Sequence, residues 1–141
     1  MADASNKSAT ISAASTHTYG RFIIDARQNH FVADASTGRE GPHEAPIATE
    51  LFHASLATCA LAVVTDAARK AEIRNAVYRV DVSSTPDDND GTRFSQVAFA
   101  FHFSGVSKSA AERLVKEFTD ICPIYNTVAR TTPVDITIAV A

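Results

Sequence analysis

The sequence has 141 residues and a mass of 15.0 kDa, a size typical of one domain with a substantial core. Apolar residues make up 45% and charged residues 21%, which excludes disordered and fibrous proteins. The 13 basic residues are outnumbered by 16 acidic residues, so the net charge of −3 argues against nucleic acid as a partner. The uncharged apolar stretch from Leu51 to Thr65 is shorter than the roughly 18–20 residues of a membrane span, so we expect no membrane segment. Residues 1–16 lack a secretory signal, so we expect a cytoplasmic protein.

The N-terminal third predicts a frayed end, a hairpin and a loop. Residues 1–9 are small and polar and offer nothing to pack, which indicates a frayed terminus. The β-rich segments 22–24 and 31–32 flank Arg27-Gln28-Asn29 and predict a β-hairpin. Residues 36–46 contain Gly, Pro and charges, so we expect an irregular loop that can hold part of a site.

A long helix is predicted next, over residues 48–72, because this stretch is rich in Ala and Leu and has no Gly or Pro. From Leu51 to Val64 apolar residues fall on nearly every side of the helix, which is typical of a helix buried all round. A 15.0 kDa chain has few other elements to wrap it. We therefore expect a second copy of the chain to cover it in an intimate homodimer.

The C-terminal half alternates with period two at residues 80–82, 97–103 and 134–140, which predicts three strands with one apolar face. A shorter helix is expected between the second and third, from Ser107 to Cys122, with a capping box of Ser109 and Glu112 at its start and Pro123 as its stop. The order of elements predicts a single α+β domain over residues 1–141, with strands mostly in antiparallel hairpins and helices on one side.

Cys59 and Cys122 are the chain's two cysteines, and free thiols are the usual state of cysteine in the cytosol. Each could simply pack as a small hydrophobic residue. A thiol reduces a peroxide only as a thiolate, and a second thiol must capture the sulfenic acid that forms. Burial in mid-helix raises the pKa of a thiol, so Cys59 would need a neighbouring cation. The upstream candidates are Arg21, Arg27 and Arg39, and a carboxylate such as Glu50 could hold the guanidinium in a bidentate pair.

Two motifs around these cysteines resemble those of a known family. The segment from Gly41 to Cys59 reads GP, seven further residues and ELFHASLATC, which is similar to the GP and ELLLAALGxC signature of the OsmC/Ohr family, the osmotically inducible and organic hydroperoxide resistance proteins. Cys122-Pro123, preceded by the strand end FSGVS and a helix, resembles the second motif of that family. The similarity extends from about Tyr19 to Val140.

The resemblance implies an OsmC-like α+β fold, in which antiparallel sheets wrap two long central helices of an intertwined homodimer. It also implies thiol-dependent reduction of organic hydroperoxides, alkyl or fatty-acid, with Cys59 as the peroxidatic thiol and Cys122 as the resolving thiol. No bound cofactor or metal is expected. In the family an external dithiol, commonly a lipoylated protein, reopens the resulting disulfide.

The chain departs from the peroxidase pattern at one place. Well-studied peroxidases carry Glu ten residues before the reactive cysteine, where this chain has Thr49, with Glu50 one residue later. The broader OsmC-like subgroup has Glu at the Glu50 place. For the cation, Arg39 resembles the placement in the osmotically inducible branch and Arg21 that in the hydroperoxide-resistance branch; both stay open, and we favour Arg39.

Other functions are weaker on sequence grounds. A zinc site lacks ligand spacing, since His53 and Cys59 are six residues apart on a helix and no CxxC occurs. The acidic turn of Asp87, Asp88 and Asp90 lacks the bidentate Glu of a calcium loop. The alternative function is a non-catalytic OsmC-like dimeric binding or stress-response protein without an activated thiol, and Thr49 favours it.

Overall fold

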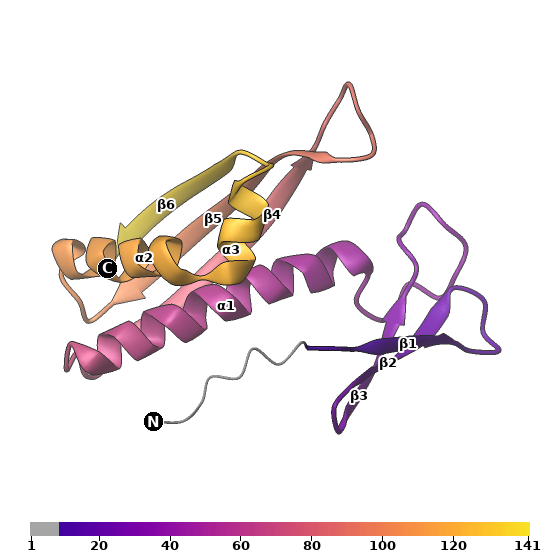
Figure 1. Cartoon of the computed structure of the whole chain (residues 1–141), viewed down its shortest axis with the longest axis horizontal. Helices are drawn as coiled ribbons and strands as arrows, with labels where there is room; N and C mark the ends of the chain where they lie inside the picture. Colours follow the sequence, from indigo (N-terminus) through magenta and orange to yellow (C-terminus); the bar gives the residue numbers. More distant parts are fainter. Residues whose placement is uncertain (1–8) are drawn as a thin grey trace. The chain divides into compact units, whose positions relative to one another are not determined.

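The computed structural model describes residues 9–141, so the frayed end predicted for residues 1–9 lies, except for its last residue, outside the described residues. The chain divides into two compact units, one ending at Leu51 and the other running from Phe52 to Ala141. The long helix α1 (Ala48–Lys70) begins in the first unit and continues in the second (Figure 1).

The first unit contains a three-stranded antiparallel sheet in the order β1-β2-β3, formed by β1 (Ser12–Ser15), β2 (Arg21–Ala26) and β3 (Asn29–Asp34). The predicted hairpin is confirmed, because Phe22 pairs with Ala33 and Ile24 with Phe31 across β2 and β3. Strand β1 was not predicted, since its sequence SAAS has weak strand propensity and is held by pairing with β2.

The second unit contains a sheet in the order β4-β5-β6, formed by β4 (Val77–Pro86), β5 (Phe94–Ser104) and β6 (Val134–Val140). Strands β4 and β5 are antiparallel, as predicted, but β5 and β6 are parallel, with Val97 opposite Val134. The other strand pairs within residues 9–141 are antiparallel, as expected, and the β5–β6 pair is the exception. It arises because the chain crosses back through helices before it enters β6, as parallel neighbours require.

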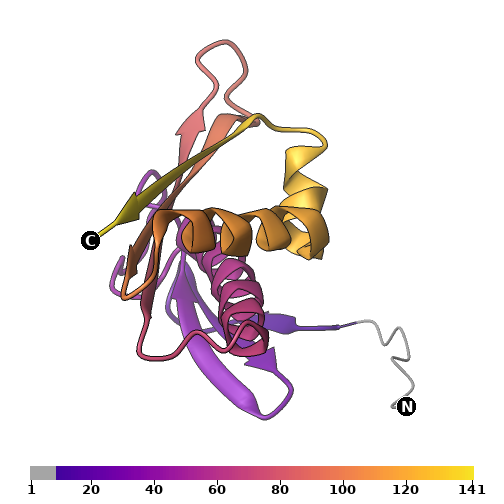
Figure 2. The same ribbon diagram turned by 90° about the vertical axis from the view of Figure 1, so that its left-hand side faces the viewer.

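The core of the second unit lies between this sheet and the helices, which occupy the same face of the sheet (Figure 2). Alternate residues of β5 point inward, where Phe99 and Phe101 stack on each other and the Phe118 ring packs at an angle against both. All three rings are at most 1% exposed. His102 lies between two inward-pointing residues of β5, so its side chain is on the opposite face of the sheet, where its Nε2 is 3.1 Å from an oxygen of Asp81.

Helix α1 ends at Lys70, two residues before the predicted end, because Glu72 adopts a φ of 55° and Ile73 N–H donates to the Ala68 carbonyl. Within one chain its burial is one-sided, and cover of its remaining side by a second copy stays a prediction. The buried residues are Leu56, Ala60, Val64, Ala67 and Ala68, and the exposed side holds Ala54, Ser55, Thr58, Ala62 and Thr65.

By length and composition α1 could also span a membrane, with a mean hydropathy of 1.5, but the core helix of a soluble protein meets the same criterion.

Two helices follow β5 where one was predicted. Helix α2 (Lys108–Ile121) is capped by Ser107, whose Oγ accepts from Ala110 N–H at 3.2 Å, so the predicted capping box at Ser109 is wrong. Pro123 ends α2 but also opens α3 (Pro123–Ala129), because proline is well tolerated in the first helical turn. Cys122 is therefore the C-cap of one helix and the N-cap of the next.

Candidate active site

Cys59 and Cys122 form a disulfide, with 6.5 Å between their Cα atoms. They are 63 residues apart in the sequence, Cys59 in the middle of α1 and Cys122 at the junction of α2 and α3. Both pack on the same apolar cluster of the second unit. The fold thus brings together the two thiols of the sequence motifs.

The two sulfurs have different surroundings. Cys122 is fully buried, at 0% exposure, whereas Cys59 is only partly buried. Tyr125 N–H donates to Cys122 Sγ at 3.4 Å, and the Tyr125 ring packs on Phe118 with 4.9 Å between centroids. Asn126 fixes the junction further, because its Nδ2 donates to the carbonyl of Cys122 at 2.9 Å. Cys122 is thus held in place by both its backbone and its side-chain contacts.

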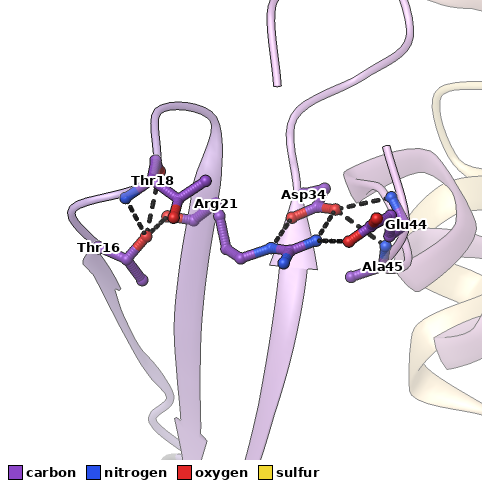
Figure 3. A network of polar contacts seen from close by, with 6 residues as sticks. All are labelled: Thr16, Thr18, Arg21, Asp34, Glu44 and Ala45. Atoms are coloured by element: carbon purple, nitrogen blue, oxygen red, sulfur yellow. Dashed lines mark hydrogen bonds and ion pairs between the residues drawn. The ribbon is translucent and has the colours of Figure 1, made fainter. Parts of the chain in front are cut away.

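In the first unit, Arg21 lies between two carboxylates (Figure 3). Its Nε donates to Asp34 Oδ1 at 2.8 Å and its Nη2 to Asp34 Oδ2 at 2.9 Å, which is a bidentate pair. Nη2 also donates to Glu44 Oε2 at 3.0 Å. The turn that leads into Arg21 is fixed by Thr16, whose hydroxyl donates to the Arg21 carbonyl and accepts from Thr18 N–H, each at 3.1 Å.

Asp34 is the buried charged residue of this network, and sequence reasoning missed it. Its side chain is 0% exposed, and Oδ2 accepts the backbone N–H groups of Glu44 and Ala45, each at 2.9 Å. The Arg21 guanidinium, followed by these two amides, holds the pKa of Asp34 well below its ordinary value. The available signal was weak: an acidic residue at the end of an apolar strand.

Arg39 and Glu50, the other predicted site residues of the first unit, are placed differently. Arg39 is exposed in the loop after β3, where its N–H donates to the Ser36 carbonyl at 2.9 Å. It lines an apolar cavity of about 470 Å³ together with Phe22. Glu50 Oε2 accepts from Ile47 N–H at 2.9 Å, which satisfies an amide at the start of α1. Its carboxylate therefore has a capping function in this structure.

His53, the one histidine near Cys59 in sequence, points to another partner. Its Nε2 lies 2.8 Å from Ser84 Oγ of strand β4, so it ties α1 to the sheet of the second unit. Within residues 9–141, no group of three His, Cys, Asp or Glu side chains is arranged to hold a metal ion.

A family model for OsmC-like proteins matches residues 41–137, most of the chain. The chain belongs to the OsmC-like protein family. The matched segment contains both cysteines of the disulfide and the loop residues from Gly41 onward. No curated protein matches the sequence.

Solved structures of this family share the fold at low sequence identity. An OsmC-like protein from Mycoplasma pneumoniae has a TM-score of 0.77 and 16% identity, covering 96% of this chain and 99% of its own. The organic hydroperoxide resistance protein OhrB of Bacillus subtilis has a TM-score of 0.66 and 18% identity, covering 94% of this chain and 98% of its own. A third, from Psychrobacter arcticus, titled a putative osmotic stress induced and detoxification response protein, has a TM-score of 0.74 and 22% identity, covering 94% of this chain and 97% of its own.

These similarities confirm the predicted α+β OsmC-like fold, with two small sheets and a long helix. The family has members named for organic hydroperoxide resistance. The two-cysteine arrangement of this chain therefore occurs on a fold that hosts such proteins.

Proposed function

We propose that this protein is a cysteine-dependent peroxidase that reduces organic hydroperoxides. The observation that carries the proposal is the Cys59–Cys122 disulfide, which joins the cysteines of both motifs within one apolar cluster. A disulfide between a partly buried and a fully buried sulfur is the expected product of a peroxidatic and a resolving thiol.

In the reduced protein, the Cys59 thiolate attacks the distal oxygen of the hydroperoxide, the O–O bond breaks, and the alcohol leaves after taking a proton. Cys59 is then a sulfenic acid. The Cys122 thiol attacks the Cys59 sulfur and displaces water, which forms the disulfide. An external dithiol, such as the lipoyl group of a lipoylated protein, then donates two electrons and two protons and restores both thiols.

The burial of the two sulfurs supports this division of roles. A peroxide or an external thiol reaches Cys59 before Cys122, because Cys122 is enclosed by the core of its own unit. The apolar cluster on which Cys59 packs favours alkyl and fatty-acid hydroperoxides over hydrogen peroxide. In this proposal Arg39 or Arg21 supplies the cation for the Cys59 thiolate, and Glu50 acts by fixing the start of α1.

The proposed functional form is a homodimer. Its support is the exposed side of α1, which holds Ala54, Thr58 and Ala62, small residues that allow another surface to approach closely. Light scattering should give about twice the chain mass of 15.0 kDa. A mass equal to one chain at working concentration would contradict the dimer.

The test of the function is a thiol count. The reduced protein is mixed with cumene hydroperoxide, and free thiols are measured over time. We expect loss of two thiols per chain within seconds, and no such loss of the Cys122 thiol in Cys59→Ser. In the matched variant Cys122→Ser, we expect Cys59 to form a sulfenic acid that a dimedone probe labels. Unchanged thiols after several minutes in the wild-type protein would overturn the proposal.

A second function, that of a non-catalytic binding or stress-response protein, is favoured by one observation. The Glu50 carboxylate is used by the Ile47 amide at the helix start, and Thr49 has no carboxylate to hold an arginine. The Cys59 thiol pKa separates the two functions. A value at or above about 8.5, from alkylation rates against pH, favours the non-catalytic protein.

A further inference from the structure

The last turn of α2 lacks one of its hydrogen-bond donors. In a continuous helix the Thr119 carbonyl would accept from the N–H of residue 123, but this residue is proline and has no N–H. A carbonyl at a helix end needs a substitute donor when no backbone N–H reaches it. The Asn126 side chain of α3 supplies that donor, because its Nδ2 donates to the Thr119 carbonyl at 3.0 Å.

The same side chain also holds the residue that carries the sulfur. Asn126 Nδ2 donates to the Cys122 carbonyl at 2.9 Å, and the backbone N–H of Asn126 donates to the same oxygen at 3.0 Å. An amide nitrogen of a side chain carries two hydrogens, which is enough for one bond to each carbonyl. Asn126 therefore links α3 directly to the last turn of α2, across the Cys122 junction.

Helix α3 has few other contacts that fix its direction. The chain turns sharply between α2 and α3 (Figures 1 and 2). Helix α2 buries five of its side chains, whereas none of the side chains of α3, which lies wholly in the described part of the chain, is buried. The direction of α3 matters to the sulfur, because Tyr125 N–H, in the first turn of α3, donates to Cys122 Sγ at 3.4 Å.

We propose that Asn126 is a positioning residue for the resolving step: by linking α2 to α3, it keeps the Cys122 sulfur within bonding distance of the Cys59 sulfur. Cys59 is held separately, in the middle of α1, so a change at Asn126 moves only one sulfur of the pair. This inference rests on the proposed function for the roles of the two thiols, whereas the link between the helices does not depend on it.

The position of Cys122 decides what happens to the sulfenic acid on Cys59. When the Cys122 sulfur attacks it, the S–O bond breaks, water leaves and the disulfide forms. A second hydroperoxide molecule competes with this attack. It transfers one oxygen to the sulfenic sulfur, its O–O bond breaks, the alcohol leaves, and Cys59 becomes a sulfinic acid that thiols do not reduce. Because the disulfide forms faster when the two sulfurs are held together, Asn126 protects Cys59 from irreversible oxidation.

The first test measures the position of Cys122 without peroxide. The protein is equilibrated with reduced and oxidised glutathione and quenched with acid, and mass spectrometry gives the fraction that carries the Cys59–Cys122 disulfide. Asn126→Asp has nearly the same shape but no donor at neutral pH, so the effective concentration of Cys122 toward Cys59 should fall about tenfold or more. A value within about twofold of wild type would overturn the inference.

Thr127→Val is the matched control for this equilibrium. Thr127 is exposed, and its hydroxyl donates to the Pro123 carbonyl at 2.7 Å, a bond that lies within α3 and does not link the helices. The effective concentration in Thr127→Val should therefore stay within about twofold of wild type. A substitution that destabilises the oxidised and reduced proteins equally leaves the equilibrium unchanged, so the measurement separates positioning from folding stability. If circular dichroism shows that Asn126→Asp does not fold, Asn126→Ser, which keeps one donor, decides: a fall of about threefold or more supports the inference, and no fall overturns it.

The second test follows the two oxidation steps with cumene hydroperoxide. In Asn126→Asp the rate of peroxide consumption in the first turnover should stay within about twofold of wild type, while disulfide formation should be about tenfold slower or more. Cys59 sulfinic acid, detected as the mass of two added oxygen atoms, should then form at a correspondingly lower peroxide concentration. Equal yields of sulfinic acid in Asn126→Asp and wild type would overturn the inference. A wild-type protein that leaves peroxide intact would overturn the proposed function, whereas the glutathione equilibrium would still decide the role of Asn126.

Discussion

The Cys59–Cys122 disulfide should make a large contribution to stability that can be calculated from the chain it closes. The two residues are 63 apart, and the loop-closure entropy that such a cross-link removes from the unfolded chain is about 14 cal/mol/K, or about 4 kcal/mol at 25 °C. For a chain of 141 residues, each kcal/mol moves the melting temperature by about 3–4 °C. Reduction should therefore lower the melting temperature by about 10–15 °C.

The assay compares urea unfolding of the oxidised protein, the protein reduced with a phosphine, and the double variant Cys59→Ala/Cys122→Ala, all at one protein concentration. The reduced protein and the double variant should each lose about 3–4 kcal/mol of unfolding free energy relative to the oxidised protein. Agreement between them would show that the loss comes from the cross-link and not from the reductant. A difference below about 1 kcal/mol between oxidised and reduced protein would refute the reasoning, because the reduced unfolded chain would then be as restricted as the oxidised one.

Three further predictions concern the reductive step, the core and the effect of pH. When the oxidised protein is treated briefly with glutathione and then with N-ethylmaleimide, mass spectrometry should find glutathione on the partly exposed Cys59 and maleimide on the buried Cys122; the reverse labelling would contradict the assigned roles. Phe118→Ala should cost about 3–5 kcal/mol in urea unfolding, because its ring is fully buried among three aromatic neighbours; a loss below 1 kcal/mol would contradict this packing. Folding lowers the pKa of Asp34. The stabilisation that the ionised Asp34 carboxylate gives the folded protein is therefore complete above the unfolded pKa of about 3.9, and it is lost as the pH falls toward the lowered pKa of the folded state. The urea midpoints of wild type and Asp34→Asn should therefore differ by a constant amount above pH 5 and converge from pH 4 to pH 2; a gap that widened on acidification would refute the sign.

Local periodicity explains why much of the fold could be predicted. The period-two pattern of β5 and the long run of helix formers in α1 depend only on neighbouring residues, so the sequence carries them directly. The direction of β6 depends on how the chain crosses back, which no local pattern encodes. Helix α3 cannot be predicted from Pro123 alone, because a proline that stops one helix also favours the first turn of the next.

The site was less predictable than the fold, because its key contacts join residues that are distant in sequence. The two cysteines were identified by their motifs, but spacing alone could not place Cys59 and Cys122 within reach of each other. Asp34 and Arg21 are 13 residues apart and meet through strand pairing. An isolated aspartate at a strand end is common in turns, so its burial could be recognised only from the structure.

The junction at Cys122 explains how the disulfide could open and close repeatedly without large backbone changes. Cys122 N–H donates to the Phe118 carbonyl, which ends α2, while its own carbonyl accepts from Asn126 N–H in α3. Cys59 lies in the continuous helix α1, so the 6.5 Å between the two Cα atoms is maintained by packed helices as well as by the S–S bond. Because these hydrogen bonds and the core contacts do not involve the S–S bond itself, reduction should leave the thiols close together. A resolving thiol already held beside its partner captures a sulfenic acid at high effective concentration, which is the condition that a two-cysteine peroxidase must meet.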